Sequence, residues 1–341
     1  MQPSGQERLP HLPSPAPIRF SSKAHYRITR LDSTSSGTST KYSGTIHIAS
    51  STWTGYALIY LANAKGIWRQ HGLDVNFKDV EDPNDRFIAL AAGRLEGMAS
   101  TVDAFARQQS NGVAAVEVFP IDASVGGDGI LAANTIQSVA DLKGKTVGVN
   151  QGSVSEWFLA QVLEKNGLHL SDVKETNMTS GAAGAAFVAS KIDVAVTWEP
   201  WLSRAKSRTD GHILVSSQQY PDLIMDSFAF RKDFVQKYPD TVKDFMKAYY
   251  DTFTFMNANQ TDSLKIIGDA VGEKAADVMA DLGTLQLFDL AKGKEVMGTA
   301  ASHGKIYDNV KAAADFWKAQ GKIDSAVNPS DAVDPSFINS L

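Results

Sequence analysis

Short apolar segments alternate with helical segments from residue 45 onward, and this alternation limits the possible folds more than any other feature. Residues 45–49 and 73–77 have the pattern of strands, and residues 56–71 between them carry apolar side chains at helical spacing. A helix over 85–93 and a strand over 95–100 continue the series. Because strands separated by helices pair in parallel, with helices on both faces, the sequence predicts an α/β fold with mainly parallel sheets.

A second series of the same kind follows residue 146. Its predicted helices span 155–166 and 182–190, and a strand over 226–230 is expected to lead back toward the first series. The chain has 341 residues, 43% of them hydrophobic, which is enough for two lobes with separate cores. Further strands are predicted over 116–121, 130–132, 147–149, 192–197 and 213–215, and later helices over 241–257, 261–271, 274–282 and 307–320.

Residues 1–43 differ in composition from the rest of the chain. They are rich in Ser, Thr and Pro and carry six Lys or Arg against two acidic residues, a net charge of +4 in a chain of net charge −5. They lack the apolar core of about 7–15 residues that a secretory signal needs, so we interpret them as a disordered leader or an altered N-terminus. No stretch approaches the roughly 18 apolar residues of a membrane-spanning helix. The acidic balance indicates no nucleic-acid partner.

The segment Val196-Thr-Trp-Glu-Pro-Trp201 places two tryptophans and a carboxylate at the end of a predicted buried strand. Ligands of open α/β sheets bind beyond the carboxyl ends of the strands, which is where Trp198, Glu199 and Trp201 are expected to lie. A carboxylate between aromatic rings suits a cation, through charge pairing and through the negative faces of the rings. In the alternative interpretation both tryptophans belong to the core and Glu199 begins a solvated helix.

Several further segments stand in a characteristic order along the chain. They are Trp53-Thr-Gly-Tyr-Ala-Leu-Ile-Tyr60, Ala64-Lys-Gly-Ile-Trp68, His71-Gly-Leu-Asp-Val75, Ala89-Leu-Ala-Ala-Gly-Arg-Leu-Glu-Gly97, Asp141-Leu-Lys-Gly-Lys-Thr-Val147 and Trp198-Glu-Pro-Trp201. Their joint order and spacing resemble the nitrate/sulfonate/taurine-type solute-binding proteins of ABC transporters, which have the type II periplasmic binding fold. The resemblance covers residues 45–323.

The resemblance implies two lobes that close on a small-molecule ligand, with lobe I formed by residues 44–130 plus 229–341 and lobe II by residues 131–228. The chain is expected to cross between them near 129–131 and 227–231. The resemblance also implies a monomeric extracytoplasmic receptor that presents its closed form to the permease subunit of an ABC importer. The sequence departs from the family in one respect, because no signal peptide is visible in it.

The loops that follow the predicted strands contain no Lys, Arg or His, and they contain six acidic residues. An acidic cleft disfavours an anion, because buried like charge is costly unless it is neutralised. It suits a guanidinium-type cation, which pairs with carboxylates and stacks on an indole. Asp122 and Glu199 are the favoured acids. The predicted ligand-binding residues are Trp53, Tyr56, Thr101, Asp103, Asp122, Asp128, Glu156, Trp198, Glu199, Trp201 and Asp226.

Each of these residues also has a local role that competes with ligand binding. Asp103 and Asp128 are suitable turn caps, Glu156 suits the first turn of a helix, Tyr56 suits a core, and Thr101 suits a bond to its own backbone.

The ligand itself stays open between two chemistries. Ile121-Asp-Ala-Ser-Val-Gly-Gly-Asp128 and Ser153-Val-Ser-Glu156 resemble the urea-carboxylase-associated branch of the family, which implies guanidine or a related amine or amide. Taurine, an alkanesulfonate or nitrate is the alternative, held without bases at the helix that follows Gly152-Ser153.

Enzyme functions find little support in the sequence. It contains no G-x-G-x-x-G, Walker A, G-x-S-x-G or H-E-x-x-H motif, and its seven histidines form no pair at metal-ligand spacing. A thiamine-pyrimidine-synthase-like enzyme is the main alternative, and its Cys-rich segment is missing because the chain has no cysteine. A sensor domain of LysR type would need a DNA-binding segment that residues 1–43 do not supply. We therefore expect a binding protein without cofactor or metal.

Overall fold

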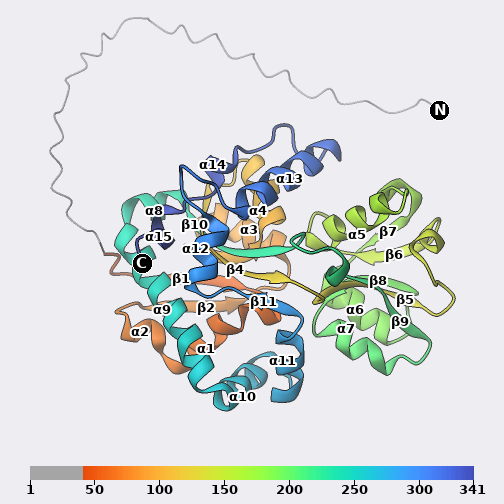
Figure 1. Cartoon of the computed structure of the whole chain (residues 1–341), viewed down its shortest axis with the longest axis horizontal. Coiled ribbons are helices and arrows are strands. Elements are labelled where there is room, and N and C mark those ends of the chain that lie inside the picture. Colours follow the sequence, from red (N-terminus) through yellow and green to blue (C-terminus); the bar gives the residue numbers. More distant parts are fainter. Residues whose placement is uncertain (1–40) are drawn as a thin grey trace, which may run out of the picture. The chain divides into compact units, whose positions relative to one another are not determined.

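The computed structural model describes residues 41–341, and these form two β-sheets flanked by helices (Figure 1). Within this range the first sheet has six strands in the order β11-β4-β10-β3-β1-β2, and the second has five in the order β7-β6-β8-β5-β9. The strands of the first sheet are β1 (Ile46–Ser50), β2 (Val75–Asp79), β3 (Gly97–Thr101), β4 (Ala115–Ser124), β10 (Met225–Arg231) and β11 (Leu285–Leu287). Those of the second are β5 (Asp128–Ala133), β6 (Thr146–Val149), β7 (Lys174–Asn177), β8 (Val194–Trp198) and β9 (Gly211–Ser216).

The first sheet is buried on both faces. Successive side chains of a strand point to opposite sides of the sheet, and in this sheet each side packs in a different apolar cluster. In β1, Ile48 belongs to the largest apolar cluster and its neighbour Ala49 to a smaller one. The larger cluster includes side chains of α1 (Ala57–Lys65) and α9 (Pro239–Ala258). The smaller one includes side chains of α3 (Pro83–Ala91) and α4 (Val102–Ser110).

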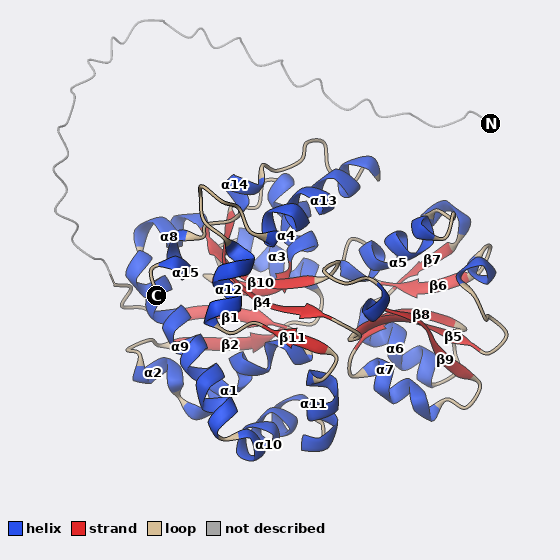
Figure 2. Ribbon diagram, in the orientation of Figure 1, coloured by secondary structure: helices blue, strands red, loops and turns tan. Residues whose placement is uncertain are grey.

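The second sheet repeats this arrangement with different helices, as the ribbon view shows (Figure 2). Ile130 of β5 packs in a cluster with side chains of α5 (Val154–Lys165), whereas the next residue, Leu131, packs with side chains of α6 (Ser180–Val188) and α7 (Trp201–Arg204). The other helices are α2 (Ile67–Gln70), α8 (Lys232–Lys237), α10 (Gln260–Val271), α11 (Ala275–Leu282), α12 (Leu290–Met297), α13 (Lys305–Ala319), α14 (Pro329–Ala332) and α15 (Ser336–Asn339).

The predicted α/β class is confirmed, and most strands of each sheet run in the same direction, with β10 and β11 reversed in the first sheet and β5 in the second. β1 pairs in parallel with β2 and β3, whereas β10 is antiparallel to both β3 and β4. In the second sheet β5 is antiparallel to β8 and β9. The reversed strands β5 and β10 enter each sheet directly from the other one, so no crossover helix precedes them to restore the common direction.

The chain passes between the sheets at 125–127 and at 217–224, since β4 and β10 belong to the first sheet and β5 and β9 to the second. Both crossings lie a few residues before the positions expected from the sequence. The division into two lobes stays a prediction, with the crossings moved accordingly. The predicted leader lies outside the described residues except for 41–43. None of the helices within residues 41–341 has the length and apolar character required to span a membrane.

Sequence patterns located the longer elements and missed several short ones. The helix predicted over 56–71 is divided into α1 and α2 at Gly66, whose φ of 66° is left-handed and favours glycine. The helix predicted over 85–93 begins earlier, because the side chain of Asp82 accepts a hydrogen bond from the Asn84 N–H and Pro83 occupies the first turn. Helices α4 and α12 and strand β11 were not predicted.

Candidate functional site

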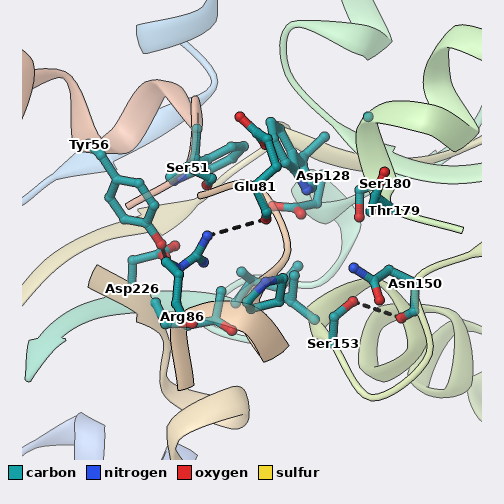
Figure 3. A pocket seen from close by; sticks show the side chains of 18 residues that line it. Ser51, Tyr56, Glu81, Arg86, Asp128, Asn150, Ser153, Thr179, Ser180 and Asp226 are labelled. Carbon is teal, nitrogen blue, oxygen red and sulfur yellow. Dashed lines mark hydrogen bonds between the residues drawn. The ribbon is translucent and has the colours of Figure 1, made fainter. Parts of the chain in front are cut away.

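A cavity of about 50 Å³ lies between the carboxyl-terminal ends of strands from the two sheets (Figure 3). The first sheet and its loops contribute Ser51, Trp53, Tyr56, Glu81, Pro83, Arg86, Ser100, Thr101, Ile224 and Asp226. The second sheet and its loops contribute Asp128, Asn150, Ser153, Val154, Thr179, Ser180, Gly181 and Trp198.

The structure brings together six of the eleven predicted ligand-binding residues in the lining of this cavity. Trp53, Tyr56, Thr101 and Trp198 lie at the ends of β1, β3 and β8 or in the loop after, as the strand-end rule predicts, whereas Asp128 and Asp226 lie at the starts of the reversed strands β5 and β10. The six are Trp53, Tyr56, Thr101, Asp128, Trp198 and Asp226, and the five that do not line the cavity are Asp103, Asp122, Glu156, Glu199 and Trp201.

Two of the acids outside the lining have local partners that account for them. Glu199 accepts hydrogen bonds from the backbone N–H of Ser203 at 2.8 Å and from its hydroxyl at 3.0 Å, so it caps the helix that follows. Glu156 accepts from the N–H of Gly152 and lies 3.5 Å from the ammonium of Lys322.

Of the other three residues outside the lining, Asp103 and Asp122 are buried in the framework around the cavity and Trp201 is partly buried. Asp122 lies opposite Asp226 in the pairing of β4 with β10 and accepts a hydrogen bond from the indole N–H of Trp53 at 3.4 Å. Asp103 lies in the first turn of α4, and Trp201 packs beside Gly184 of α6. Asp122 therefore supports a lining residue, Trp53, and does not itself face the cavity.

Asp128 is the lining carboxylate with the clearest unsatisfied capacity. It is 4% exposed, and its Oδ2 atom has no hydrogen-bond partner among residues 41–341. Burial raises the pKa of Asp128 to about 8. Nearby, the rings of Trp53 and Trp198 meet edge to face, with centroids 6.0 Å apart. A buried acceptor without a hydrogen-bond partner costs free energy. A ligand that donates an N–H to Asp128 would remove this cost and would bind more tightly for it.

A basic side chain also lines the cavity, which corrects the expectation of an entirely acidic cleft. Arg86 of α3 is 3% exposed, and its guanidinium donates to the backbone carbonyls of Val80 and Glu81. Its Nε atom has no hydrogen-bond partner among the described residues. Burial lowers the pKa of Arg86. The sequence analysis missed it because it considered only loops after strands, and Arg86 projects from the first turns of a helix.

Asp226 and Tyr56 form a hydrogen-bonded pair beside this arginine (Figure 3). The Tyr56 hydroxyl donates to Oδ1 of Asp226, and burial raises the pKa of Asp226 to about 7. In the close-up, Tyr56, Asp226 and Arg86 lie on the left of the cavity, whereas Asn150, Ser153, Thr179 and Ser180 lie on the right. The left side is therefore charged and the right side is made of hydroxyls and an amide.

The right side also contains the starts of two helices. Ser153 precedes α5 and its hydroxyl accepts from the N–H of Ser155 at 3.2 Å, and Thr179 precedes α6 and accepts from the N–H of Ala182 at 3.3 Å. Ser153 belongs to the segment that the sequence analysis named as an alternative anion site. Helix starts carry partial positive charge, so this wall tolerates a negative group.

The lining as a whole carries charges of both signs. Three carboxylates (Glu81, Asp128 and Asp226) and one guanidinium (Arg86) line it. No group of three or more His, Cys, Asp or Glu side chains within residues 41–341 is arranged to hold a metal ion. The arrangement offers charged and polar partners to a small molecule that enters between the sheets.

The buried acids predict that the free protein loses stability as pH rises. Burial raises the pKa of Asp128 and Glu117 to about 8 and that of Asp103 and Asp226 to about 7, from usual values of 3.8 to 4.5. Between the usual pKa and the raised pKa of each acid, the folded state therefore binds more protons than the unfolded state. The free energy of unfolding falls as pH rises through this range. Glu117→Gln mimics the neutral acid, so it should flatten this dependence by about 1.4 kcal/mol per pH unit between pH 5.5 and 7.5. Denaturant unfolding of the wild type and of Glu117→Gln at these two pH values measures how the free energy of unfolding of each protein changes with pH. An equal change in the two proteins would contradict the prediction.

Comparisons with known proteins agree with the fold. A family profile described as NMT1/THI5 like matches residues 53–263. A protein of Brucella abortus (strain 2308), provisionally named a binding protein, is 27% identical over 284 residues, which cover 81% of this chain and 86% of that protein. The taurine-binding periplasmic protein of Escherichia coli (strain K12) is 26% identical over 276 residues, covering 76% of this chain and 82% of its own.

Comparison with solved structures also agrees with the fold. The alkanesulfonate-binding protein SsuA of Xanthomonas axonopodis pv. citri, solved bound to MOPS, superposes with a TM-score of 0.72 at 19% identity. The match covers 85% of this chain and 97% of that one. At this identity the likeness bears on the fold alone, and it confirms the predicted periplasmic binding protein fold.

Proposed function

Because the chain belongs to the NMT1/THI5-like family, we propose that it is the solute-binding component of an ABC importer, which captures a small cationic nitrogen compound of guanidine type. The observation that carries the ligand class is Asp128, whose Oδ2 atom is buried in the cavity lining without a hydrogen-bond partner among the described residues. Asp226 and Glu81 add two carboxylates to the lining. A planar cation would supply the missing N–H donors and would contact the indoles of Trp53 and Trp198.

The size of the cavity supports the same ligand class. A cavity of about 50 Å³ favours a compact ligand such as guanidinium. The burial of Asp128 and Asp226 means that each carboxylate regains its charge most readily when a cation lies beside it. Cation binding and loss of the carboxyl proton are therefore expected to occur together.

A zwitterion of taurine type is the second candidate, and Arg86 is the observation that favours it. A guanidinium with an unpartnered Nε atom, opposite the starts of α5 and α6, suits a sulfonate, and the carboxylates suit the ammonium. One relative is named a taurine-binding periplasmic protein. Taurine has seven non-hydrogen atoms, so this ligand would fill more of the space between the sheets than guanidinium.

Location and partner follow from the same proposal. A receptor of this kind acts outside the cytoplasm and presents its closed form to a membrane permease, and we expect it to do so as a monomer without a cofactor. Release of the ligand unchanged distinguishes it from a thiamine-pyrimidine-synthase-like enzyme of the same fold, which would consume the molecule it binds.

Calorimetric titration of the full chain with guanidinium chloride, taurine and sodium nitrate in separate experiments tests the ligand class. We expect saturable one-to-one binding of guanidinium, at concentrations far below those that denature proteins. Saturable binding of taurine alone would favour the zwitterion. Binding of nitrate alone, or heat from none of the three, would overturn the proposed ligand class.

A further inference from the structure

Two serine hydroxyls join the two crossings of the chain next to the cavity. Ser124 is the last residue of β4, just before the crossing at 125–127, and Ser217 is the first residue of the crossing at 217–224. Both are 0% exposed, and their Oγ atoms lie 2.7 Å apart. Neither residue lines the cavity, so neither is part of the ligand-binding surface described above.

Two backbone N–H groups contact the pair. Ser217 Oγ accepts from the N–H of Gly126 at 2.8 Å, and the N–H of Asp128 is shared between Ser124 Oγ at 3.1 Å and Ser217 Oγ at 3.3 Å. Because either hydroxyl can donate across the 2.7 Å between them, the direction of that bond depends on where the Ser124 proton goes.

The carboxyl group of Asp128 decides that direction once it is ionised. A carboxylate only accepts, and a hydrogen bond from Ser124 opposes the rise that burial causes in the pKa of Asp128. Ser124 has one proton, so it then accepts from Ser217 at 2.7 Å. With Asp128 ionised, the donor order is therefore Ser217 to Ser124 to the carboxyl group of Asp128.

We propose that Ser217 is a positioning residue for the ligand, because it fixes the carboxyl group of Asp128 in the cavity through Ser124. The expected effect on affinity rests on the proposed function, whereas the expected effect on Asp128 itself does not. It also gives the second crossing a direct effect on the site, since movement of Ser217 relative to Ser124 when the sheets separate would release Asp128. One hydroxyl thus comes from the end of β4 and the other from the crossing that follows β9.

The first test needs no ligand. The titration of Asp128 is followed by NMR in the free, full-length protein carrying ¹³C-labelled Asp, with Asp128→Asn used to assign the signal. Ser217→Ala should raise the pKa of Asp128 by about half a unit or more, as loss of one donor in the series predicts. Ser227→Ala is the matched control, because Ser227 is equally buried on β10 but donates to Glu117 at 2.6 Å instead. An unchanged Asp128 titration in Ser217→Ala would overturn the proposal.

The second test measures affinity for guanidinium in a double-mutant cycle. Ser217→Ala should weaken binding about tenfold in the wild-type background and have little further effect in Asp128→Asn, because the two residues act as a unit. Equal effects in both backgrounds would show that Ser217 acts on the fold in general and would overturn the proposal. If the wild-type protein binds no guanidinium while the Asp128 titration shifts, the proposed ligand fails and the positioning role stands.

Discussion

Asp128→Asn is expected to weaken guanidinium binding by about 3 kcal/mol, or roughly a hundredfold in dissociation constant. Asn keeps the size of the side chain but replaces one carboxyl oxygen by an amide that donates, so a cationic donor would meet no negative charge there. The loss is large because Asp128 is 4% exposed and water screens the interaction little. Isothermal titration calorimetry of both proteins at pH 8.5, above the raised pKa of Asp128, measures the difference.

Glu117→Gln provides the matched control for this experiment. Glu117 is a buried carboxyl of β4, accepts a hydrogen bond from Ser227, and does not line the cavity. Its replacement should leave the dissociation constant unchanged. The sign of the Asp128 effect is also informative, because an anion such as nitrate should bind more tightly when a neighbouring negative charge is removed. Unchanged or tighter guanidinium binding in Asp128→Asn would remove this residue from the site.

The sequence predicted the sheets and most of the long helices because their signals are local. Apolar alternation in β1 and the helical spacing of α5 are properties of a few consecutive residues. Strand direction is not a local property, since β5 and β10 have the same kind of pattern as the parallel strands. Their reversal depends on which sheet the chain has just left, and no window of residues records that.

The lining of the cavity was predicted in part, and the differences have a physical cause. The strand-end rule found Trp53, Asp128 and Asp226, but acidic residues at strand ends also cap helices and bind backbone N–H groups. Glu199 does this at Ser203, so residue type alone could not separate it from Asp128. The two kinds of acidic residue differ in whether a backbone N–H within a few residues along the chain is available for the side chain to bind. Arg86 could have been found only by placing the start of α3 against the cavity.

Phe245→Ala is expected to lower the free energy of unfolding by about 4 kcal/mol, the range found when a buried Phe is truncated in a core that cannot collapse around it. Phe245 of α9 is 0% exposed and stacks on Trp68 of α2 at 4.5 Å, and it also meets Phe228 at 4.8 Å and Phe230 at 5.2 Å in β10. One ring thus joins two helices to the strand that carries Asp226, so its loss leaves a cavity with rigid walls.

Met279→Ala is the control, because that side chain is 47% exposed and its truncation should cost at most about 0.5 kcal/mol. Denaturant unfolding at constant pH measures both, and similar losses in the two variants would mean that the aromatic cluster does not hold α9 against the sheet.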